Sequence, residues 1–186
     1  MSTVETTKNP VTTSVWGIDT AHTSIDFSVS HMVISEVTGK FKDFEGTVTA
    51  SHDDFSDAVI DVKISADSIT TENSDRDAHL RSADFFDVER FPAITFKSHR
   101  TEVNGSGKLA IAGELSMRGV TKPVSLNVRF NGKAVNPWGQ LIAAFKATAV
   151  INRKDWGLQW NKTLETGGFL VGEEIALSLN IEVVRQ

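Results

Sequence analysis

Apolar and polar residues alternate over several long stretches of this chain, and this pattern restricts the possible folds more than any other feature. In a β-strand successive side chains point to opposite faces, so strict alternation predicts a strand with one buried and one solvent-facing side. Ile25, Phe27 and Val29, for example, are separated by Asp26 and Ser28. The same alternation recurs in residues 58–65, 94–96, 109–117, 126–130 and 175–183. The pattern predicts an all-β protein.

Turn residues separate the predicted strands. The sequence Asn-Gly-Ser-Gly at 104–107 tolerates positive φ, and Asn131-Gly132 follows Phe130 at a point where a hairpin connection is expected. Short connections of this kind predict that successive strands pair antiparallel. Residues 141–151 are apolar on both faces, which fits either a helix of about three turns or a strand covered on both sides. Their place between strands favours the strand.

One short helix is predicted, over residues 73–81. Asn73 or Ser74 can cap its N-terminus, and two aspartates in the first turn interact favourably with the helix dipole. A further turn is expected over residues 84–90, after which Pro92 favours an extended chain. We therefore expect about eight strands with a short helical excursion between the third and the fourth.

Eight antiparallel strands can either form two packed sheets or close into a barrel, and closure removes the edges that invite aggregation. Periodicity alone does not decide between these two arrangements. If the eight strands close into an antiparallel barrel, its interior is just wide enough for side chains or one small ligand. Strands of about nine residues tilted by ~40° would make it ~23 Å tall. The barrel domain is expected over residues 15–186, after a disordered tail over residues 1–14 that is rich in Thr and Ser.

Composition excludes several classes of function. The formal net charge of −5 and the lack of Lys/Arg runs argue against nucleic acid as a partner. The chain has no Cys, which rules out disulfides, thiolate metal sites and cysteine nucleophiles. No stretch approaches the roughly 18 apolar residues of a transmembrane helix, so no membrane span is expected. The first residues do not resemble a secretory signal, so we expect a soluble cytoplasmic protein; a signal removed earlier would leave the same sequence.

Several motifs, in order along nearly the whole chain, resemble the YceI-like family. The first is Trp16-Gly17-Ile18-Asp19, followed by His22-Thr23-Ser24-Ile25 and Phe27. Later motifs are Arg76-Asp77-Ala78-His79-Leu80, Asp84-Phe85-Phe86-Asp87, Phe91-Pro92, Arg118-Gly119-Val120-Thr121-Lys122-Pro123-Val124 and Asn152-Arg153-Lys154-Asp155-Trp156-Gly157. The resemblance implies a lipocalin-like antiparallel barrel whose apolar tunnel takes up an isoprenoid or acyl chain. Many members of the family carry a secretory signal, and this chain departs from them there.

The candidate ligand-binding residues follow from the tunnel that the resemblance implies. Arg76 and His79 are three residues apart in the predicted helix, so they share a face and could meet one polar head group. The alternative is that Arg76 pairs with Asp84 or Asp87 to hold the helix across the barrel mouth. The further candidates are His22 and His31, with Phe27, Phe41, Phe96, Phe145 and Trp156 along the interior.

For two of these candidates a structural role is the stronger interpretation. His22 is expected to form a hydrogen bond that fixes the start of the first strand, and Trp156 is expected to contribute packing. No histidine pair has the i, i+4 spacing of a helical zinc site, and no nucleophile stands in a recognisable motif. We therefore expect no metal site, no cofactor and no catalytic residue.

The favoured function is binding, transport or storage of a polyisoprenoid, quinone-like or fatty-acyl ligand inside the barrel. One alternative is a stress-related or interaction protein whose barrel is packed and holds no ligand. A weaker alternative is an enzyme that acts on a lipid-like substrate through His22 or His79. The resemblance also makes a homodimer plausible.

Overall fold

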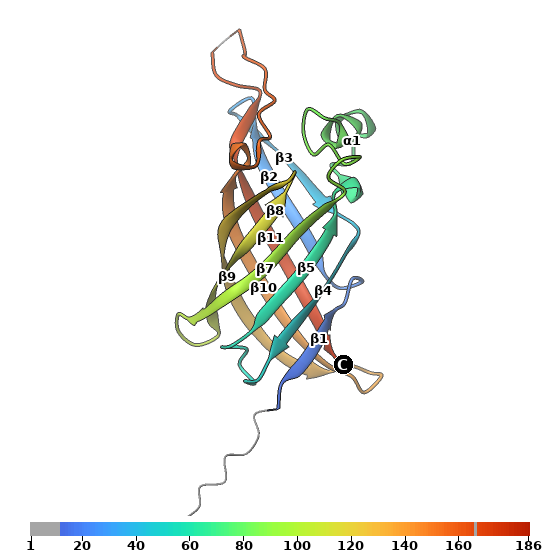
Figure 1. The fold of residues 1–186 in the computed structure, drawn as a ribbon, viewed down its shortest axis with the longest axis vertical. Helices are drawn as coiled ribbons and strands as arrows, with labels where there is room; N and C mark the ends of the chain where they lie inside the picture. Colours follow the sequence, from blue (N-terminus) through green and yellow to red (C-terminus); the bar gives the residue numbers. More distant parts are fainter. Residues whose placement is uncertain (1–11, 166) are drawn as a thin grey trace, which may run out of the picture.

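The structure is a computed structural model that describes residues 12–165 and 167–186 (Figure 1). Its strands are β1 (Ser14–Ile18), β2 (Ser24–His31), β3 (Ser35–Phe41), β4 (Phe44–Ala50), β5 (Val59–Ser65), β6 (Ile69–Thr70), β7 (Ala93–Val103), β8 (Lys108–Met117), β9 (Val120–Val135), β10 (Leu141–Asn152) and β11 (Val171–Arg185). The helices are α1 (Ser74–Arg81) and the 3-10 turns η1 (Ala66–Ser68) and η2 (Arg153–Trp156).

The strands form a closed antiparallel barrel. The order around it is β1, β4, β5, β7, β8, β9, β10 and β11, and β11 pairs back with β1. β2 pairs with the first part of β11 and with β3, so β1 and β2 together form one interrupted barrel strand. β3 and β4 form another in the same way, because β3 pairs with β2 and β4 pairs with β1. The predicted eight-stranded lipocalin-like barrel is confirmed.

The barrel is taller than expected because several strands continue past their predicted ends. β9 has 16 residues and β11 has 15. At ~3.3 Å per residue and a tilt of ~40°, a strand like β11 spans ~38 Å along the barrel axis rather than ~23 Å. The walls of the barrel are therefore taller than the sequence predicted.

The predicted helix is present between the third and fourth barrel strands, as α1 between β5 and β7. The Asn73 side chain accepts a hydrogen bond of 2.9 Å from the backbone N–H of Arg76, as expected of an N-cap residue. The predicted N-terminal tail lies almost wholly outside the described residues, and β1 begins at Ser14, one residue before the predicted domain boundary. None of the described helices combines the length and apolarity needed to cross a bilayer.

The hairpin predicted at Asn131-Gly132 is wrong. β9 runs through both residues, and the connection to β10 lies at residues 136–140, where Asn136 N–H donates to the Gln140 carbonyl at 2.9 Å. Gly132 pairs with Ala144 and Phe130 with Phe145, so Asn131 is an extra residue on β9. Gly132, with φ +128°, therefore lies at a β-bulge. A bulge, like a turn, can require the positive φ that glycine adopts readily.

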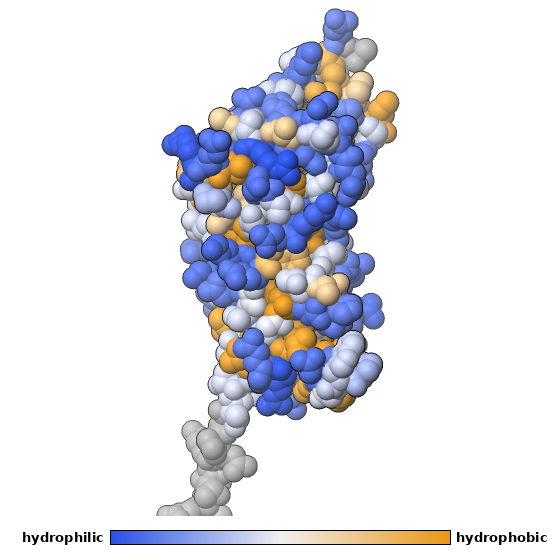
Figure 2. Space-filling view, turned by 90° about the vertical axis from the view of Figure 1, so that its right-hand side faces the viewer, coloured by the Kyte–Doolittle hydropathy of each residue, from blue (hydrophilic) through white to orange (hydrophobic). Residues whose placement is uncertain are grey.

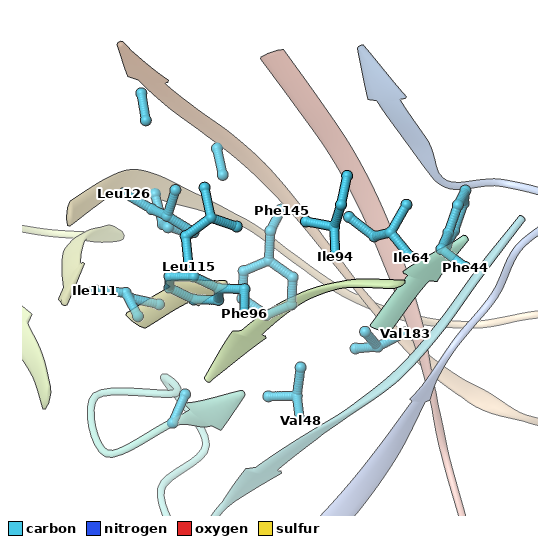
Figure 3. Close-up of a cluster of buried hydrophobic side chains, with 14 of the residues drawn as sticks. Phe44, Val48, Ile64, Ile94, Phe96, Ile111, Leu115, Leu126, Phe145 and Val183 are labelled. Carbon is cyan, nitrogen blue, oxygen red and sulfur yellow. The ribbon is translucent and has the colours of Figure 1, made fainter. Parts of the chain in front are cut away.

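The segment over residues 141–151 is a strand, as favoured, but it is covered on one face only. Ala143 and Ala147 face the interior and are fully buried, whereas Lys146 and Val150 face outward and Val150 is 64% exposed. Large buried side chains from the opposite walls fill much of the interior (Figure 3). The outer face shown in Figure 2 mixes hydrophilic and hydrophobic residues.

Candidate functional site

Four aromatic rings pack together at the end of the barrel that holds the β4–β5 connection, which is the lower end in Figure 1. Phe55, in the connection from β4 to β5, is 1% exposed. Its ring centroid lies 5.2 Å from that of Trp16, 5.3 Å from that of Phe130 and 4.9 Å from that of Phe145. We call these four residues the base cluster. The rings of the base cluster pack against one another and occupy the space between the strands at this end.

The upper end carries two groups of rings that are less tightly enclosed. Phe27 on β2, Phe41 on β3 and Phe86 form the upper aromatic cluster, in which the centroids of Phe27 and Phe86 each lie 5.9 Å from that of Phe41. All three side chains are half-buried. They supply an apolar surface that a ligand entering at this end would meet.

A second group of rings, the His79 cluster, joins α1 to the segment that follows η2. The His79 ring lies 5.1 Å from that of Phe85 and 4.7 Å from that of Trp160, and the last two are 5.4 Å apart. α1 and η2 both lie at the upper end of the barrel (Figure 1). The His79 cluster therefore links α1 to the segment after η2 at the upper end of the barrel, which we call the mouth.

The interior wall at this end is incompletely packed. Leu177 and Leu179 on β11 lie opposite Phe27 and Ile25 of β2, and opposite Ala149 and Ala147 of β10. Directly opposed residues share a face, so these side chains point inward with the buried alanines. Leu177 and Leu179 are nevertheless half-buried, whereas Ala147 is fully buried. Inward-facing groups that keep solvent-accessible surface show that protein atoms do not fill this part of the interior.

A groove of about 420 Å³ lies on the outer face of the sheet here, lined mainly by alternate residues of β2, β3 and β11 that face away from the interior, such as Asp26 and Ser178, and by the β6–α1 connection. Among the described strands, β6 pairs with β3 only at Lys40 and Phe41. The earlier residues of β3 pair with β2 on one side and form a sheet edge on the other. A Cβ at Gly39 would lie 2.4 Å from Cζ of Phe27 and 2.9 Å from the carbonyl oxygen of Thr70. Glycine at this position therefore lets Phe27 and β6 approach β3.

Asp77 anchors α1 to the barrel. Its carboxylate is buried and accepts hydrogen bonds from the Thr70 hydroxyl at 2.9 Å and from the Thr71 backbone N–H at 2.7 Å, as well as from the Thr71 hydroxyl. Burial alone would raise the pKa of Asp77, but the hydrogen bonds from Thr71 and Thr70 outweigh it and lower the pKa. The charged form of Asp77 thus holds the helix beside the mouth.

Replacing Asp77 with Asn is expected to reduce the free energy of unfolding at pH 7 by about 2 kcal/mol, because bonds to a charged acceptor become bonds to a neutral amide. A lowered folded-state pKa contributes stability above the unfolded pKa of ~3.9, and this contribution disappears as the pH falls through the folded value. Urea unfolding should therefore show that the difference between the two proteins shrinks below about pH 4. The exposed Asp75→Asn serves as control, and an equal loss there would contradict the assignment.

Arg76 and His79, the predicted head-group residues, do not converge on one point by hydrogen bonding. Arg76 donates from Nε to the Thr71 hydroxyl at 2.6 Å and from Nη2 to the Thr71 carbonyl at 2.9 Å. His79 Nε2 lies 2.9 Å from Oδ2 of Asp84. The alternative pairing of Arg76 with Asp84 or Asp87 is therefore wrong; Thr71 takes the place of those partners, and Asp84 pairs with His79.

His22 lies in the turn between β1 and β2, where its Nδ1 is 2.9 Å from Oδ2 of Asp19 and 3.7 Å from Oε1 of Glu182. The hydrogen bond between His22 and Asp19 lowers the pKa of Asp19 and raises the pKa of His22. This is the structural hydrogen bond expected of His22. The ligand atoms of the three residues lie within 4.8 Å of one another, a spacing that a divalent cation could bridge. His31 ends β2, with Nδ1 3.4 Å from the Ser35 hydroxyl.

The predicted aromatic residues divide between two levels of the barrel. Phe27 and Phe41 come together at the upper end, in the upper aromatic cluster. Phe145 belongs to the base cluster, and Phe96 is buried in the core between the walls (Figure 3). Trp156 is 2% exposed and donates from Nε1 to the Leu115 carbonyl at 3.0 Å, which is a packing position.

Sequence reasoning did not single out Phe86, Trp160 or Arg153, which the structure places at the upper end. Arg153 follows Ile151 by two residues at the end of a strand whose alternate residues face inward. That two-residue spacing indicates that Arg153 continues the inward-facing series of β10, and it could have been recognised in the sequence. For Phe86 and Trp160 no periodic pattern was available, because both lie in irregular connections.

Comparison with known proteins gives consistent results. A family model described as the YceI-like domain matches residues 16–183. UPF0312 protein SA2479 of Staphylococcus aureus is 34% identical over 165 residues, which cover 88% of this chain and 94% of that protein. A Campylobacter jejuni YceI protein is similar in structure with a TM-score of 0.71 and 26% identity, covering 100% of this chain and 98% of the other.

Two solved structures with lower identity share the fold. BcnA of Burkholderia cenocepacia has a TM-score of 0.77 at 18% identity, over 89% of this chain and 98% of BcnA. A polyisoprenoid binding domain from Saccharophagus degradans has a TM-score of 0.66 at 14% identity, over 92% of this chain and 98% of that domain. The family model over residues 16–183 and the 34% identical relative establish that the chain belongs to the YceI-like family.

Proposed function

We propose that this protein binds, and thereby transports or stores, a long-chain apolar ligand in the upper part of its barrel. The observation that carries the proposal is the inward-facing but half-buried wall that includes Phe27, Leu177 and Leu179, at the end opposite the base cluster. Apolar surface of this kind gains free energy when a ligand removes it from water. The proposed ligand is a polyisoprenoid, quinone-like or fatty-acyl molecule, and no turnover of it is proposed.

Two further considerations support this ligand class. The Saccharophagus degradans neighbour with the same fold is described as a polyisoprenoid binding domain. Burying ten methylene groups at ~0.8 kcal/mol each would give ~8 kcal/mol before the costs of ordering are subtracted, which corresponds to micromolar affinity.

The first experiment is native mass spectrometry of the protein purified from its own source, followed by solvent extraction and identification of the released molecule. We expect a stoichiometric prenyl or acyl lipid. Protein at its bare mass that also takes up no added prenyl or acyl lipid would contradict the proposal and favour the packed barrel without a ligand.

The second experiment varies the chain length of the ligand. Straight-chain fatty alcohols of about ten to sixteen carbons are expected to gain roughly fourfold in affinity per methylene group until the interior is full. Titration by displacement of an apolar fluorescent dye measures this directly. Affinity that does not change with chain length would place the ligand outside the barrel.

A further inference from the structure

Arg153 is the only buried cation among the Lys and Arg residues of the described chain, with 3% of its surface exposed. It stands at the start of η2, directly after β10, at the upper end of the barrel (Figure 1). Its Nε donates to the Gly172 carbonyl at 2.8 Å and its Nη1 donates to the Leu158 carbonyl. The side chain therefore joins the end of β10 to the start of β11 beside the mouth.

One donor group of this guanidinium has no partner. Nη2 is buried and has no hydrogen-bond acceptor within the described residues. It is also closed to bulk solvent, so water outside the protein does not satisfy it. A buried donor without an acceptor destabilises the folded protein, and more so when the group is charged, so such a group calls for an explanation.

The charge of Arg153 also lacks a contacting counter-ion. Both of its acceptors are neutral carbonyl groups, and no carboxylate in the described part of the chain lies within ion-pair distance of it. Glu173 is nearby, but its carboxylate is engaged by Lys154 Nζ and by Asn152 Nδ2. Burial accordingly lowers the pKa of Arg153. A buried cation is stabilised chiefly by an anion in direct contact, and residues 12–165 and 167–186 supply none to Arg153.

Arg153, which carries this unpaired donor, lies close to residues of the barrel interior. Ile151, two residues earlier on β10, lies opposite Ile175 and packs against the core. Leu158 and Trp156, on either side of the turn that contains Arg153, are buried as well. Arg153 is thus buried at the upper end of the β10–β11 wall that faces the proposed ligand chain.

We propose that Arg153 binds the anionic head group, a carboxylate or a phosphate, of the ligand whose apolar chain occupies the barrel. This inference rests on the proposed function and adds the class of head group to it. The planar guanidinium matches both oxyanions in geometry and charge. The head group would provide the acceptor for Nη2 and the counter-ion for the buried charge together. A neutral alcohol of the same chain length would provide neither charge nor a comparable bond.

The test compares anionic and neutral ligands with matched chains: hexadecanoate with hexadecan-1-ol, and farnesyl phosphate with farnesol. The full-length protein is expected to bind the preferred anion about 10- to 100-fold more tightly than its alcohol. A preference within the first pair identifies a fatty-acyl carboxylate, and one within the second a prenyl phosphate. Because the proposed pair is buried, the preference should persist in about 1 M salt, where exposed pairs are screened.

Arg153→Met is expected to abolish the preference for the anion while leaving affinity for the alcohol within about twofold, because the apolar chain still fills the interior. The matched control is Arg118→Met. Arg118 also donates to two backbone carbonyls, of Gly157 and Ala83, and should keep the preference when replaced. Arg153→Lys, which retains the charge but not the planar fork, is expected to keep part of the preference.

Equal affinity of the unmodified protein for acid and alcohol would overturn the inference, even if no Arg153 variant folds. So would a preference that vanishes at high salt or with Arg76→Met rather than Arg153→Met, since either result would place the head group at an exposed site. Failure to bind any member of either pair would instead overturn the proposed function itself. The two failures are therefore distinguishable.

Discussion

Replacing Phe55 with Ala is expected to lower the free energy of unfolding by about 3–5 kcal/mol. Phe55 is almost fully buried, and its ring contacts those of Trp16, Phe130 and Phe145, which come from three different strands. Truncation loses the burial of the ring and leaves a cavity that rigid neighbours fill only in part. Chemical denaturation followed by far-UV circular dichroism measures the loss, and the melting temperature should fall by on the order of 10 °C.

Two further variants test whether the loss of stability in Phe55→Ala comes from lost packing. Phe55→Leu keeps an apolar side chain at the base and is expected to lose less than half as much stability as Phe55→Ala. Phe169→Ala removes a ring that is 53% exposed and should change stability by about 0.5 kcal/mol or less. If Phe55→Ala were as mild as Phe169→Ala, the base cluster would not close the lower end of the barrel, and access to the interior from that end would have to be considered.

The strands could be predicted from the sequence because alternation is a local signal. Each run such as residues 58–65 reports its own inward face, and β5 and β11 follow it. Closure of the barrel depended on a contact that no local pattern reports, the pairing of β1 with β11 across nearly the whole chain. The bulge at Gly132 was misread for the same reason, because only the pairing with Ala144 distinguishes a bulge from a turn.

The candidate site was harder to predict because alternation gives the face of a strand but not the height along the barrel. Phe27 and Phe145 both point inward, yet Phe27 lies at the mouth and Phe145 in the base cluster. Strand register sets the height, and register depends on the partner strands. The proposal for Arg153 rests on Nη2, a donor without an acceptor among the described residues, and such a donor becomes visible only when its surroundings are known.

Trp156→Ala is the second substitution for which a large loss is expected, about 3–5 kcal/mol. Trp156 is 2% exposed, and its Nε1–H bonds to the Leu115 carbonyl, so it fixes η2 to β8. The substitution removes a large buried surface and also leaves that buried carbonyl without its indole donor. Because η2 also contains Arg153, the same loss is expected to weaken any preference for an anionic ligand. Denaturation should be followed by far-UV circular dichroism, since the substitution itself changes tryptophan fluorescence.

Trp156→Phe should retain most of the packing and lose only the hydrogen bond, at a cost of about 1–2 kcal/mol. Trp138 offers the matched control, because it lies in the connection between β9 and β10 and is 79% exposed. Trp138→Ala is expected to change stability by about 0.5 kcal/mol or less. A similar small change for Trp156→Ala would mean that η2 is held by its backbone and by Arg153 alone. In that case the Arg153 guanidinium would determine the shape of the upper end of the barrel as well as bind the proposed head group. Arg153→Met would then have to lower the affinity for alcohols too.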